Sequence, residues 1–87
     1  MVSDLKILHE LLERMIKHAE NKNPKAVIEL NEIFDDIYLR IIRKSADPIH
    51  QFYDQCRLSC ILSINPRKFE ESILNAKKIF SEIPKPK

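Results

Sequence analysis

Three dipeptides that pair a capping residue with proline place the strongest constraint on how this chain folds. They are Asn23-Pro24, Asp47-Pro48 and Asn65-Pro66. Asn and Asp side chains cap helix N-termini, and proline suits the first helical position, where no backbone N–H is needed. Proline also disfavours helical geometry in the residue before it. Each dipeptide therefore ends one helix and begins the next, and we expect Ser3 to cap a first helix that runs to about Ala19.

Apolar residues recur at helical spacing in all of the segments that these dipeptides separate. The chain has no glycine, which excludes a P-loop, a dinucleotide-binding turn and the ordinary tight hairpin turn. No segment predicts a strand, and the short connections favour helices that fold back on their neighbours. We therefore predict an all-α antiparallel bundle of four helices in one domain, residues 1–87, with a loose tail at 84–87.

Composition narrows the function classes. Lys and Arg total 15 against 13 Asp and Glu, so no electrostatic case exists for direct binding to nucleic acid or to an anionic membrane. No apolar run approaches the ~20 residues of a membrane span. The two cysteines, without a secretory signal, predict a cytoplasmic protein with reduced thiols. No nucleophile, base and orienting group come together in the sequence, so we do not expect an enzyme.

The helix predicted over residues 23–44 carries two adjacent apolar stripes and is expected to lie at the centre of the bundle. The second stripe contains two polar residues, Asn31 and Asp35, which lie one turn apart and point the same way. Two interpretations are open. The pair lines a ligand or metal cavity between helices, with Tyr38 beside it, or it makes hydrogen bonds to a neighbouring helix or to water at the bundle edge.

The second half of the third predicted helix is apolar on more than one side. Leu58, Ile61 and Leu62 do not continue the face that carries Cys56 and Cys60. A bundle of four helices leaves such a segment in need of cover, so we predict that these residues form a homo-oligomer interface. The two cysteines lack a second Cys or His pair at zinc-site spacing, which favours core packing over a metal or redox role.

The segment from residue 5 to 58 resembles the FCD domain, the helical effector-binding half of FadR-like regulators in the GntR family. In that family a helix rich in leucine precedes a polar break, and the next helix carries a D-x-x-F-H motif. Here the corresponding residues are Asn31-Glu32-Ile33-Phe34-Asp35, followed by a family-like turn, Ser45-Ala46-Asp47-Pro48-Ile49. A later family pattern, E-H-x-x-I-L-x-A, matches the segment 69–76 at Ile73, Leu74 and Ala76.

The resemblance also implies which residues would bind an effector or a metal. Family members hold a divalent metal with the Asp and His of the first motif and two later histidines. Here those positions carry Asn31, Asp35 and Glu70, and the helix with the last histidine is not present. Oxygen ligands for a hard cation remain at these three residues, but nitrogen ligation of a transition metal is lost. No resident cofactor is therefore expected, and a divalent metal is the alternative.

Two functional hypotheses follow. The resemblance implies a truncated FCD-type domain that senses an effector through Asn31, Asp35, Tyr38 and Glu70, or a remnant of such a domain. Because the family's winged-helix DNA reader is missing, regulation of transcription would require a separate DNA-binding protein. The alternative is a homo-oligomeric helical protein-interaction module without a small-molecule ligand.

Overall fold

A computed structural model describes residues 3–85, and they form a bundle of α-helices. The helices are α1 (Asp4–Glu20), α2 (Pro24–Lys44), α3 (Ile49–Leu62) and α4 (Phe69–Glu82), with a short 3₁₀ helix η1 (Pro66–Lys68) before α4. No strand occurs in this part of the chain. The all-α prediction is confirmed. Of the predicted tail, Pro84 and Lys85 are irregular and exposed, while 86–87 lie outside the described residues.

The predicted caps explain where the helices begin. Ser3 Oγ accepts a hydrogen bond from the Lys6 backbone N–H at 3.2 Å, and Asn23 Oδ1 accepts one from Ala26 at 3.4 Å. Asp47 Oδ1 accepts from the Ile49 N–H at 3.0 Å where α3 begins. The prediction for the last helix needs a correction. Asn65-Pro66 opens η1 rather than the α-helix, because the first turn here is the tighter 3₁₀ form that often precedes a helix.

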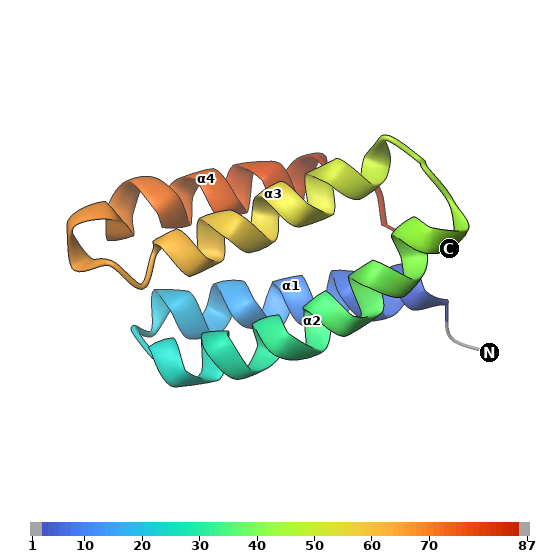
Figure 1. The fold of residues 1–87 in the computed structure, drawn as a ribbon. Coiled ribbons are helices and arrows are strands. Elements are labelled where there is room, and N and C mark those ends of the chain that lie inside the picture. The colour runs from blue at the N-terminus through green and yellow to red at the C-terminus, as the bar shows by residue number, and fades with distance from the viewer. Residues whose placement is uncertain (1–2, 86–87) are drawn as a thin grey trace.

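Figure 1 shows two helical hairpins, α1–α2 and α3–α4, stacked on each other with both hairpin turns at the same end of the bundle. The most extensive packing joins α1 to α2 and α3 to α4. Helices α1 and α3 each pack against all three other helices, whereas α2 packs mainly on α1 and, less closely, on α3. The core between the hairpins holds eight large side chains that are almost fully buried: Leu8, Leu12, Met15, Val27, Phe34, Tyr53, Cys56 and Cys60.

The expectation that the second helix is central was wrong, since α1 and α3 pack against all the other helices and α2 packs less extensively. The buried face of α1 carries only apolar residues from Leu8 to Ala19. In α2 only the first stripe is buried, through Val27 and Phe34 among others, while Ile28 and Ile42 at the ends of the second stripe are 48% and 41% exposed. The polar pair in the middle of that stripe keeps this side of α2 at the surface. Within residues 3–85, no helix has the length and apolar character needed to cross a membrane.

Candidate functional site

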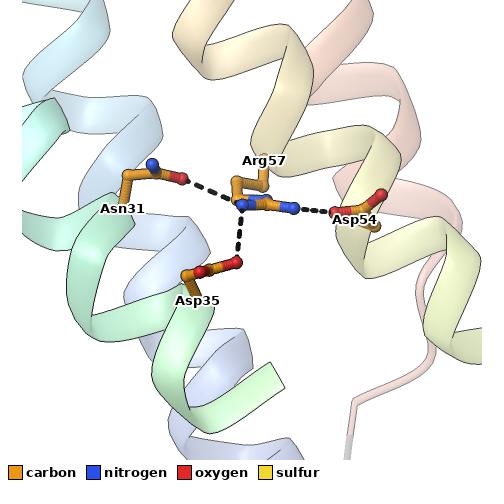
Figure 2. Close-up of polar contacts among 4 residues, drawn as sticks. All are labelled: Asn31, Asp35, Asp54 and Arg57. Atoms are coloured by element: carbon orange, nitrogen blue, oxygen red, sulfur yellow. Dashed lines mark hydrogen bonds and ion pairs between the residues drawn. The ribbon is translucent and has the colours of Figure 1, made fainter. Parts of the chain in front are cut away.

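The polar pair on α2 meets an arginine from α3 (Figure 2). Nη1 of Arg57 donates to Oδ1 of Asp35 at 3.2 Å and lies 3.5 Å from Oδ1 of Asn31. Nη2 of the same guanidinium donates to Asp54, three residues earlier on α3. Asn31 and Asp35 come within reach of one guanidinium because side chains four residues apart share a helix face. These contacts connect the two hairpins.

Two aromatic rings of α2 lie beneath the guanidinium. Its central carbon is 5.4 Å from the ring centroid of Phe34 and 5.9 Å from that of Tyr38, and these two rings stack with centroids 5.8 Å apart. A cation over aromatic faces at this range is favourable. Burial, reinforced by the carboxylate of Asp54, raises the pKa of the Tyr38 hydroxyl, and the positive charge of Arg57 acts in the opposite direction. The tyrosine therefore stays neutral at physiological pH.

The space that Asn31 and Asp35 face is occupied by the Arg57 guanidinium. The arginine side chain is only 16% exposed, whereas the Asp35 side chain is 48% exposed. The geometry thus matches the second interpretation of the pair, hydrogen bonding to a neighbouring helix at the edge of the bundle. With one cation and two carboxylates, the cluster joins α2 to α3.

The remaining predicted site residues lie in two places. Tyr38 adjoins the cluster beneath the guanidinium. Glu70 instead lines a separate cavity at the end of the bundle where the hairpin turns lie, and neither Asn31 nor Asp35 lines that cavity. The three oxygen-bearing residues proposed as weak metal ligands are therefore not brought together as a set. Residues 3–85 contain no group of three or more His, Cys, Asp or Glu side chains arranged to hold a metal.

Sequence reasoning missed two residues of this cluster, Arg57 and Asp54. Arg57 could have been identified from its position, because it is a cation on a helix whose nearby residues Tyr53, Cys56 and Cys60 are apolar and buried. A largely buried cation needs an acidic partner. Asn31 and Asp35 were the unexplained polar residues on the preceding helix, so the pairing was available in principle.

The two cysteines belong to the core, as predicted. Both are free thiols and fully buried, and Sγ of Cys56 donates to the backbone carbonyl of Ala76 at 3.4 Å. A side-chain hydrogen bond with Cys60, together with burial, raises the pKa of the Cys56 thiol well above its ordinary range. The thiolate that redox chemistry or metal binding requires is therefore disfavoured.

The outer side of the second hairpin carries an exposed apolar surface, which we call the α3–α4 face. Its apolar part is Leu58 (49% exposed), Leu62 (50%) and Leu74 (66%). These leucines border two grooves of about 510 and 420 Å³ that run between α3 and α4 and share the residues Ser59, Asn75 and Lys78. A 2.9 Å hydrogen bond from Asn75 Nδ2 to Ser59 Oγ crosses between the helices there. Charged residues of both signs line the grooves: Lys68, Glu71, Lys78 and Glu82.

Two of the three residues predicted for an oligomer interface lie on this face. Leu58 and Leu62 are exposed there, but Ile61 is partly buried and packs against the core. Ile61 directly precedes Leu62 in the chain, so its side chain is rotated by about 100° from that of Leu62 around the helix axis and turns toward the core. Leu74, from the next helix, takes the third apolar position of the face.

Comparisons with known proteins give no relative for this arrangement. No protein-family model matches the chain, and neither the curated proteins nor the solved structures provide a match. The FCD resemblance therefore stays an expectation drawn from short motifs, and the function must be argued from the residues themselves.

Proposed function

We propose that this chain is a helical interaction module that pairs with a second copy of itself through the α3–α4 face. The observation that carries the proposal is the cluster of Leu58, Leu62 and Leu74, each about half exposed or more. Contiguous exposed apolar side chains on a small domain mark interaction surfaces, because their removal from water contributes roughly 25 cal/mol per Å². A domain of 87 residues has a small core and gains stability from such pairing.

The charges around the leucines favour a second copy over other partners. The grooves carry two lysines, Lys68 and Lys78, and two glutamates, Glu71 and Glu82. In a dimer with twofold symmetry the same surface is used by both chains, so a twofold rotation can set lysines of one copy opposite glutamates of the other. A nucleic acid or a strongly charged protein would instead favour a surface of one sign.

The first test of this proposal introduces a glutamate at either of two apolar residues that are equally exposed. Leu62→Glu lies on the α3–α4 face, and Ile33→Glu is its matched control, since Ile33 is 49% exposed on α2 away from that face. We expect sedimentation velocity to show a concentration-dependent dimer for the wild type and the control. Leu62→Glu should be a monomer. A wild type that stays monomeric at high concentration, or equal behaviour of both variants, would refute the proposal.

The second test uses charge reversal. One variant carries Lys68→Glu and Lys78→Glu, and the other carries Glu71→Lys and Glu82→Lys. Each should be monomeric by itself, because like charges then face each other across the twofold axis. An equimolar mixture should form a heterodimer. If mixing restores no association while the wild type dimerises, the leucines pair in an arrangement without this charge complementarity and the predicted symmetry is wrong.

The effector-sensing role implied by the FCD resemblance receives less support. It requires an accessible space beside Asn31 and Asp35, and the Arg57 guanidinium lies there at 3.2 Å from Asp35. A ligand at that position would have to displace a charged group that already has partners on both helices. We therefore place the interaction role first.

A further inference from the structure

A cavity of about 510 Å³ lies at the end of the bundle where the two hairpin turns meet. Figure 1 shows the α1–α2 turn and the α3–α4 connection at this same end. The volume falls within the range of small-molecule sites. Val27 is fully buried in its wall, and Ile64 and Phe69 are partly buried there. The cavity thus has an apolar interior built from both hairpins.

Charged side chains line the rim of this cavity. Lys22 comes from the first turn, whereas Arg67 and Glu70 come from the segment that begins with η1. The ammonium of Lys22 lies 5.2 Å from the ring centroid of Phe69. Among the described residues, the ion pairs involve Arg57 and Lys77 as cations, so neither Lys22 nor Arg67 has a carboxylate partner. Two cations from opposite hairpins therefore face one cavity with their charges available.

The backbone of Lys22 has the left-handed conformation that closes the C-terminal end of α1. It has a φ of 55°, the one positive φ among the described non-glycine residues. The Lys22 N–H donates to the Ala19 carbonyl at 3.1 Å, and the Asn23 N–H donates to the His18 carbonyl at 2.9 Å. Helices that end with this pair of hydrogen bonds usually have glycine at the position that Lys22 occupies. A lysine here costs about 1–2 kcal/mol in backbone strain.

We infer that this cavity binds a small monocarboxylate with an apolar body. Lys22 and Arg67 hold the carboxylate, and the hydrocarbon part lies against Val27, Ile64 and Phe69. Charge-assisted hydrogen bonds from the two cations orient the anion, while the apolar wall supplies the hydrophobic part of the affinity. Glu70 on the same rim repels a second carboxylate, so the site selects monoanions over dianions. This inference is independent of pairing through the α3–α4 face.

The test is titration of the full chain with hexanoate, followed by backbone amide NMR shifts. We expect the shifts to gather at the residues around the cavity, and we expect the uncharged analogue hexanol to bind more weakly. Lys22→Gly removes the ammonium while glycine suits the left-handed backbone, so the fold is retained, as circular dichroism would verify. This variant and Arg67→Gln should each weaken hexanoate binding by about tenfold, the scale of one charge-assisted hydrogen bond.

Two controls make the result specific. Lys25→Gln removes a nearby exposed cation that does not line the cavity and should leave hexanoate affinity unchanged. Glu70→Gln should improve the binding of adipate, a dicarboxylate, relative to hexanoate. The inference is overturned if hexanoate causes no localised shifts at millimolar concentration, if hexanol binds as well as hexanoate, or if Lys22→Gly and Arg67→Gln both bind hexanoate like the wild type.

Discussion

The contact between Arg57 and Asp35 should measurably stabilise the packing of one hairpin on the other. Replacing Arg57 with Met keeps an apolar stem but removes the charge. The pair with Asp35 is partly exposed, which limits it to about 0.2–1 kcal/mol. The pair with Asp54 within α3 adds about 0.3–0.5 kcal/mol, and the position over Phe34 and Tyr38 adds roughly 0.5–1 kcal/mol. We expect Arg57→Met to lower the free energy of unfolding by about 1–2.5 kcal/mol.

A double-mutant cycle isolates the part that belongs to the hairpin contact. Arg57→Met, Asp35→Ala and the double variant are unfolded in urea and followed by circular dichroism, and the coupling energy is compared with that of Lys77→Met and Glu20→Ala. In the control pair, Lys77 Nζ lies 3.0 Å from Glu20 Oε2, and the two side chains are 49% and 41% exposed. The Arg57 side chain is only 16% exposed. We expect about 0.5–1 kcal/mol for Arg57–Asp35 and roughly 0–0.3 kcal/mol for the control. A coupling energy for Arg57–Asp35 no larger than the control value would refute the reasoning.

Other measurements address the core and its titratable groups. Leu12→Ala on α1 should cost about 2–5 kcal/mol of unfolding free energy, while Leu39→Ala, 40% exposed on α2, should cost under about 1 kcal/mol. Similar losses would contradict the burial of Leu12 and the surface position of this side of α2. Thiol reagents should label the buried cysteines only as fast as the chain unfolds, and rapid labelling of the folded protein would count against their burial. Burial raises the pKa of Tyr53, and of Tyr38, above the ordinary value of 10.0. The free energy of unfolding should therefore fall as pH rises above 10.0, because the unfolded chain then ionises its tyrosines more readily than the folded one. Tyr53→Phe should reduce this loss in alkaline denaturation curves.

The helices and their caps were predictable because they depend on local chemistry. Ser3 and Asn23 accept the hydrogen bonds that their position before a helix predicts, and the buried face of α1 follows its apolar spacing. The surface position of α2 was not predictable in the same way. Counting apolar residues around one helix does not reveal how many neighbours cover it, and most of the cover on α2 comes from α1, with less from α3.

The candidate sites depended even more on relations between helices. Asn31 and Asp35 were identified as an unusual pair, but their partner is set by the rotation of α3 about its axis, which brings Arg57 toward them. The cavity at the hairpin turns joins residues such as Lys22 and Arg67 that are far apart in the chain. The left-handed backbone of Lys22 had no sequence signal, because glycine is the residue that normally marks this conformation.

The pairing of each helix with its neighbour in the chain has a consequence for the order of folding. Because the most extensive packing joins consecutive helices, each hairpin closes only a short loop, and a chain of this kind is expected to fold rapidly. The Arg57 contacts with Asp35 and Asn31 span 22 and 26 residues and can form only when the two hairpins dock. Loss of the Arg57 side chain should then accelerate unfolding far more than it slows folding, which makes this arginine a determinant of how long the folded state persists.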